Sequence, residues 1–110
     1  MKTFSDLTFT PHPSKPDAVQ ARLDLGGGLV ASVMANKTHK PFSLYGSVAE
    51  NLWEVAIIQA GRLLPISICD TVAGWQTPGQ VNELFRLAQT RPDWPAELRS
   101  KAEAHKRELA

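Results

Sequence analysis

The spacing of apolar side chains divides the chain into a series of strands followed by helices. Apolar and polar residues alternate over 18–25, and a second strand-like run at 29–35 follows three consecutive glycines. A period of two is the signature of a β-strand, and glycine accepts the positive φ of a tight turn. These residues therefore predict a β-hairpin.

A second pair of strands is predicted over 52–59 and 63–68. The first alternates and becomes apolar on both faces near Ile58, so we expect it to lie in the centre of the sheet. Pro65 lacks an N–H group, which predicts that the other strand lies at an edge or is irregular. Residues 69–76 are then expected to form a connection.

The rest of the chain predicts two helices of different character. Thr77, Pro78 and Gln80 supply an N-cap, a first helical residue and a capping box. One apolar stripe follows, up to about residue 90. The next helix, 93–109, is polar on nearly all sides, so it either packs loosely on the body, pairs with a partner or frays.

Residues 1–17 are expected to form an extended arm outside the interior of the sheet. Three prolines between positions 11 and 16 fix φ and remove N–H groups. Phe4, Leu7 and Phe9 are expected to anchor this arm to the body. The alternative is an exposed arm that binds a partner.

Together these elements predict a single α+β domain over 1–110, with the arm at 1–17, a body at 18–90 and the C-terminal helix at 93–109. Its four-stranded, mainly antiparallel sheet consists of two β-hairpins packed by one amphipathic helix. The other face of the sheet would expose an apolar patch if the last helix does not cover it. The residues of this patch are Val30, Met34, Leu52, Ile58 and Leu63.

Composition and charge narrow the class of protein. The 12 Lys and Arg residues nearly balance the 11 Asp and Glu residues, which argues against a broad basic surface for nucleic acid. Cys69 is a single cysteine without an internal disulfide partner, as in proteins of a reducing cytoplasm. No apolar run has the length of a signal peptide or of a membrane span. We therefore expect a cytoplasmic protein without a membrane segment.

The residue patterns argue against catalysis and metal binding. His12, His39 and His105 lie far apart and lack the spacing of metal ligands. Cys69 is followed by Asp70, and an adjacent anion disfavours a reactive thiolate, so we expect Cys69 to be a core residue at a strand end. The glycine triplet lacks the Lys and Ser or Thr of a phosphate-binding loop. We predict a protein that is not an enzyme and that holds no cofactor.

Candidate contact residues lie in the 36–47 loop and at two tryptophans. The loop places cations near aromatic rings, and tryptophan is enriched in binding hot spots. The alternatives are a solvated loop and tryptophans that close the core. The candidates are Lys37, His39, Lys40, Phe42, Tyr45, Trp75 and Trp94.

The order of four segments resembles a family of small bacteriophage and prophage proteins of unknown function. The opening MKTFSDLTFTPHP resembles a "DL-F-PHP" start, and ARLDLGGGLVASV resembles the strand and glycine turn that follow it. YGSVAENLWEVAII resembles a "YG…WEVAVL" strand, and ISICDTVAGWQTPGQVNELFRLAQ resembles "ITDDVIGYLT-EEV…L…VQ". The resemblance covers residues 1–90. It implies a phage origin and a shared fold, but no catalytic residues.

Two features depart from the pattern of this family. Cys69, Asp70 and Thr71 stand where an acidic pair is common, and the helix at 93–109 resembles an addition.

We therefore predict a small non-enzymatic binding protein that covers the surface of a host or phage protein in the host cytoplasm. Inhibitors of host defence, such as anti-CRISPR proteins, are one form of this function, which needs shape and charge complementarity alone. One alternative is a nucleic-acid-binding accessory protein that uses the 36–47 loop. Another is a protein that sequesters a small ligand or nucleotide in a pocket. A homodimer is left open by the sequence.

Overall fold

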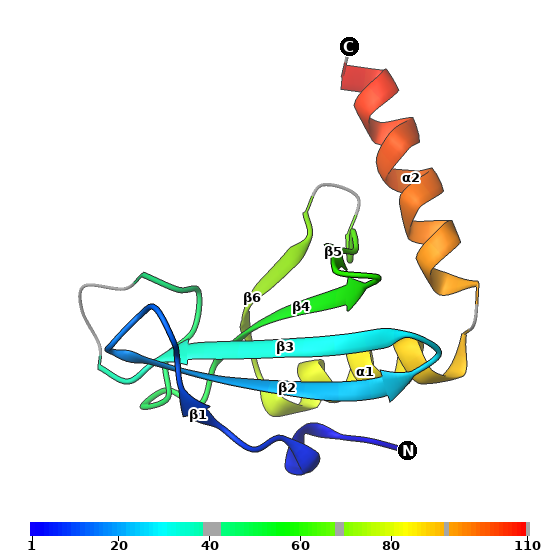
Figure 1. Ribbon diagram of the computed structural model, residues 1–110. Coiled ribbons are helices and arrows are strands. Elements are labelled where there is room, and N and C mark those ends of the chain that lie inside the picture. Colours follow the sequence, from blue (N-terminus) through cyan, green and yellow to red (C-terminus); the bar gives the residue numbers. More distant parts are fainter. Residues whose placement is uncertain (39–42, 68–69, 92, 110) are drawn as a thin grey trace.

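The computed structural model describes residues 1–38, 43–67, 70–91 and 93–109. Its strands form one antiparallel sheet, followed in sequence by two helices that pack on it (Figure 1). This confirms the predicted α+β class. The strands are β1 (Thr10–Pro11), β2 (Ala18–Gly26), β3 (Leu29–Asn36), β4 (Trp53–Gln59), β5 (Arg62–Leu63) and β6 (Val72–Gln76). The helices are the short 3-10 helix η1 (Phe4–Asp6), α1 (Pro78–Thr90) and α2 (Trp94–Leu109).

The hairpin of β2 and β3 forms as the alternation predicts. Its register pairs Leu23 with Ala31. Gly27 and Gly28 form the turn with φ values of 62° and 80°. Both values lie in the left-handed region that a type I′ turn requires, and such a turn matches the twist of the two strands. The glycine triplet is therefore a hairpin turn.

β4 lies in the interior of the sheet, with β3 on one side and β5 and β6 on the other. Val55 and Ile57 are fully buried and belong to one apolar cluster with Val81 and Phe85 of α1. The predicted central strand is confirmed, and its apolar residues form much of the core beneath the helix.

The edge beyond β4 differs from the predicted strand at 63–68. β5 ends at Leu63, and the main chain then turns so that the N–H of Ile66 donates to the carbonyl of Asp70 (3.0 Å). Pro65 has no N–H group with which to continue a ladder, which explains the early end of β5.

The predicted connection at 69–76 is also wrong, because its second half forms β6. β6 pairs with the first part of β4, from Trp53 to Ala56, whereas β5 pairs with Ile58 and Gln59 at the end of β4. The sheet formed by the described residues therefore has six strands rather than the four that were predicted.

α1 begins where the capping box predicts. Oγ1 of Thr77 accepts from the N–H of Gln80 (3.2 Å), and Oε1 of Gln80 accepts from the N–H of Thr77 (2.9 Å). Val81, Phe85 and Ala88 are buried along one stripe of the helix. Through this stripe α1 packs across one face of the sheet (Figure 1).

The N-terminal arm is attached to the body, which confirms the anchoring role of its apolar residues. The ring of Phe9 stacks on Trp53 with centroids 4.6 Å apart, and the ring of Phe4 lies 5.3 Å from the same side chain. The N–H of Phe4 also donates to Oδ1 of Asn82 on α1 (2.7 Å). As expected, the arm stays outside the interior of the sheet, since β1 pairs only with the outer edge of β2.

α2 confirms the predicted C-terminal helix, and its first turns dock on the body. Trp94, Pro95 and Leu98 are buried. Arg99 donates to Oε1 of Gln59 at the end of β4 (2.5 Å). Beyond this point the helix projects past the sheet (Figure 1).

Candidate functional site

Two of the predicted contact residues, Tyr45 and Trp75, meet at the end of the sheet where β4 begins. The main-chain N–H of Trp75 donates to the carbonyl of Tyr45 (2.8 Å). Tyr45 is 62% exposed and Trp75 is 38% exposed. We call these two residues the aromatic surface. They are far apart in sequence, so their proximity depends on how the fold holds each of them.

Tyr45 is held in place through Asn36, the last residue of β3. The Nδ2 group of Asn36 donates to the carbonyls of Leu44 (2.8 Å) and Gly46 (2.7 Å). Its Oδ1 accepts from the N–H of Ser43 (3.2 Å). Asn36 is only 2% exposed, so these bonds are shielded from water. They bind residues 43–46 to the end of the sheet and fix the main chain on both sides of Tyr45.

Two glycines permit the close contacts of this segment. A Cβ at Gly46 would lie 2.9 Å from the carbonyl oxygen of Leu52, so the segment lies directly on the backbone near the start of β4. A Cβ at Gly74 would lie 2.6 Å from Cβ of Tyr45. The Tyr45 side chain therefore rests against the backbone of β6, where a larger residue would displace it.

Trp75 is presented by an irregularity in β6. The register with β4 pairs Trp53 with Gln76 and then Val55 with Ala73, so β6 contains one extra residue at this point. Such a β-bulge redirects a side chain and bends the strand. Trp75 has a φ of 54°, in the left-handed region that bulky side chains rarely adopt. A residue held in this way costs about 1–3 kcal/mol of conformational free energy, which the surrounding structure must offset.

The charged part of the predicted contact loop is described only at Lys37. Its side chain is exposed, and its main-chain N–H donates to the carbonyl of Asp17 (2.8 Å). His39, Lys40 and Phe42 lie outside the described residues, as does the predicted strand-end position of Cys69.

Trp94 is placed in the core rather than on the surface. It is 4% exposed and belongs to the same apolar cluster as Phe85 and Leu98. It lies at the start of α2 and is buried in this cluster, so it contributes to docking α2 on the body and is not part of the aromatic surface.

The side chain of Asp70 bonds to the main chain at the start of β6. Oδ1 of Asp70 accepts from the N–H of Val72 (3.1 Å), so this side chain caps the turn before β6. In the predicted apolar patch, Leu63 is 52% exposed while the other four residues are partly buried.

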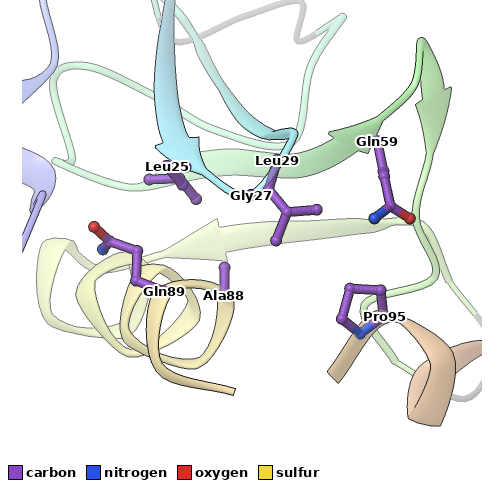
Figure 2. A pocket seen from close by; sticks show the side chains of 8 residues that line it. Leu25, Gly27, Leu29, Gln59, Ala88, Gln89 and Pro95 are labelled. Carbon is purple, nitrogen blue, oxygen red and sulfur yellow. The ribbon is translucent and has the colours of Figure 1, made fainter. Parts of the chain in front are cut away.

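A cleft of about 420 Å³ lies at the opposite end of β4 from the aromatic surface (Figure 2). The amide of Gln89 is occupied by the main chain of Lys2 (2.8 and 2.7 Å), while Oε1 of Gln59 accepts from Arg99. The lining residues are Leu25, Gly26, Gly27, Leu29, Gln59, Ala88, Gln89 and Pro95. The lining is thus mostly apolar, with polar groups at its margin that already bond within the chain.

The electrostatic environment of the aromatic surface includes one carboxylate bonded directly to it. Oε1 of Glu54 accepts from the main-chain N–H of Tyr45 (3.2 Å). Elsewhere, on the exposed face of α1, Arg86 donates to the Glu83 carboxylate (2.5 and 2.9 Å). This bond lowers the pKa of Glu83 and raises the pKa of Arg86. The pair on α1 does not contact the aromatic surface.

Within the described ranges, no group of three His, Cys, Asp or Glu side chains is arranged as metal ligands would be. Neither α1 nor the described length of α2 is long and apolar enough to cross a bilayer. Comparison of the chain with protein-family models, with curated proteins and with solved structures finds no match in any of the three.

Proposed function

We propose that this chain is a non-enzymatic binding protein that occupies a surface of another protein through Tyr45 and Trp75. The observation that carries the proposal is the left-handed Trp75, an exposed tryptophan whose main chain bonds directly to that of the exposed Tyr45. A strained backbone persists only where the surrounding structure enforces it, and such residues cluster at functional sites. Tyrosine and tryptophan are also the residue types that dominate binding hot spots.

The way in which the pair is held supports a role in contact. Asn36 fixes the backbone on both sides of Tyr45, and the bulge fixes the direction of Trp75. Two rigid aromatic side chains lose little conformational freedom when a partner covers them, which favours affinity. The aromatic surface thus has the preorganisation that binding by occupancy requires.

The finer proposal is that the partner is a host or phage protein in the cytoplasm of an infected bacterium. The resemblance of residues 1–90 to small phage proteins supports this origin. Within it, inhibition of a host defence protein, such as a CRISPR effector, is the form of occupancy that we propose to test first. We choose this form because the chain resembles small phage proteins, and the choice does not depend on the chemistry of a particular residue.

The test compares capture by the wild-type chain with capture by the double variant Tyr45→Ala/Trp75→Ala. Immobilised protein is incubated with lysates of infected and uninfected bacteria, and retained proteins are quantified by mass spectrometry. Leu109→Ala is the matched control, because Leu109 is an exposed apolar residue at the end of α2. Thermal unfolding establishes that each variant is folded.

We expect one protein to be enriched by wild type and by the control, and to be lost with the double variant. Its affinity should fall by roughly 30-fold or more, since truncating a hot-spot residue costs about 2 kcal/mol or more. Equal retention by the double variant would contradict the role of the aromatic surface. Capture that disappears after nuclease treatment, with direct binding of a labelled single-stranded oligonucleotide, would favour the nucleic-acid alternative instead.

A further inference from the structure

The cleft at the end of β4 has apolar walls from the β2–β3 hairpin and from both helices (Figure 2). Leu25 and Leu29 lie on the two sides of the hairpin turn. Ala88 comes from the second half of α1 and Pro95 from the start of α2. These residues are buried. The volume of about 420 Å³ lies within the range of about 300–1,000 Å³ that is typical of small-molecule sites.

Gln59 brings a polar group with unused hydrogen-bonding capacity to this cleft. Its side chain reaches from β4 toward the cleft, with the amide nitrogen on the side of Leu29 and the oxygen turned away (Figure 2). Arg99 fixes this orientation, because a guanidinium group only donates hydrogen bonds and its partner must therefore be Oε1 (2.5 Å). Nε2 bonds to no described residue, so its N–H groups are available to a ligand.

The other amide at the cleft has no N–H group to offer. Oε1 of Gln89 accepts from the main-chain N–H of Lys2 (2.8 Å). Its Nε2 donates to the carbonyls of Lys2 (2.7 Å) and Phe85 (3.0 Å), which uses both N–H groups. Among the described lining side chains, Gln59 is therefore the one that can donate to a ligand.

The charge of the lining restricts the class of ligand. None of the eight described residues that line the cleft is charged. Moving an ion from water into an apolar site costs much free energy unless an opposite charge pairs with it, whereas a neutral molecule avoids this cost. Access is provided at Gly26 and Gly27, where a Cβ would meet no atom within 4 Å. The cleft is therefore open on this side and suited to a neutral molecule.

We propose that the cleft binds a small neutral molecule that has an apolar body and one acceptor oxygen. The apolar body packs between Leu25, Leu29 and Ala88. The oxygen accepts a hydrogen bond from Nε2 of Gln59. Because the cleft lies at the opposite end of β4 from the aromatic surface, this ligand leaves that surface accessible. The site is thus independent of the protein contact proposed above.

An NMR titration of the isotopically labelled full chain with acetophenone tests the proposal. Acetophenone is neutral and combines an apolar ring with one carbonyl oxygen. We expect saturable shifts of the main-chain signals of Leu25, Leu29 and Ala88, and of the side-chain NH₂ signals of Gln59, at up to about 10 mM ligand. Benzoate, a charged molecule of similar size, should bind more weakly. The absence of saturable shifts at these residues, or tighter binding of benzoate, would overturn the proposal.

Gln59→Leu tests the hydrogen bond to the ligand. It should weaken acetophenone binding by about 3–10-fold, the loss expected for one hydrogen bond. It should not weaken binding of ethylbenzene, which has a similar shape and no oxygen. Gln20→Leu is the matched control and should bind as wild type, because Gln20 is a half-buried residue of β2 that does not line the cleft. Equal affinity of Gln59→Leu and wild type for acetophenone would show that Gln59 does not hold the ligand as proposed.

Ala88→Leu tests the location of the site, because the Cβ of Ala88 points into the cleft (Figure 2). The larger side chain should weaken binding of acetophenone and ethylbenzene at least tenfold. Ala104→Leu makes the same change on the projecting part of α2 and should bind as wild type. Thermal unfolding establishes that each variant is folded. Binding that persists in folded Ala88→Leu would overturn the site, and if this variant does not fold, Gln59→Leu at its half-buried position decides.

Discussion

Asn36 connects the end of β3 to the segment that carries Tyr45, so its substitution tests how this segment is held. In Asn36→Ala, the bonds from Nδ2 to the carbonyls of Leu44 and Gly46 are both lost. The carbonyl of Gly46 keeps its bond from the main-chain N–H of residue 36 (3.0 Å). The carbonyl of Leu44 keeps no bond to another described residue, and Leu44 is 7% exposed.

The expected loss of stability follows from these two bonds. A net intramolecular hydrogen bond contributes about 1 kcal/mol, and a buried group left without a partner costs about 1–3 kcal/mol. Together they predict that the free energy of unfolding falls by about 2–4 kcal/mol. For a chain of this size, the melting temperature should fall by on the order of 15 °C.

Urea titration followed by tryptophan fluorescence measures this change. The matched control is Ser100→Ala, because Ser100 is exposed on α2 and makes no hydrogen bond through its side chain to a described residue. We expect the control to lie within about 0.5 kcal/mol of wild type. If Asn36→Ala were destabilised by less than about 1 kcal/mol with an unchanged slope, the side chain would not hold this segment as described.

Three further predictions follow from single contacts. Gly74→Ala would place a Cβ 2.6 Å from Cβ of Tyr45, so we expect a loss of about 1–3 kcal/mol in urea titration; an unchanged midpoint would contradict the contact. Ala60 has a φ of 51° in the turn between β4 and β5, so Ala60→Asn should stabilise the protein by up to about 1 kcal/mol, and a lower urea midpoint would refute this. The Arg86 hydrogen bond lowers the pKa of Glu83, so its small, salt-screened stabilisation is present above the unfolded-state pKa and is lost as the pH falls through the folded-state value. An NMR titration of the Glu83 carboxyl should show a higher pKa in Arg86→Gln than in wild type, and equal values would exclude this cause.

The parts of the fold that were predicted correctly depend on local patterns. The alternation of β2 and β3 and the capping box of α1 each involve residues close in sequence, so their signals are complete within a short window. β6 was missed because its bulge at Gly74 and Trp75 interrupts the alternation. Its identity as a strand depends on pairing with β4, which no local pattern records.

The candidate site was predictable by residue type but not by arrangement. Tyr45, Trp75 and Trp94 were equal candidates, yet the fold exposes the first two and buries the third. The difference arises from the position of each residue relative to the core. Asn36 was not singled out, because an asparagine before a loop is common and only the folded chain shows that its side chain is buried.

The attachment of the N-terminal arm to α1 sets an order of events during synthesis. Lys2 and Gln89 bond to each other across 87 positions of sequence. A ribosome adding about 5–20 residues per second needs roughly 4–17 s to cover that distance. Both strands of the β2–β3 hairpin are synthesised well before then. The hairpin can therefore form before α1 is available to bond to the arm. Phe4 therefore gains its contact with Asn82 of α1 late in folding, although it leaves the ribosome before the residues of the hairpin.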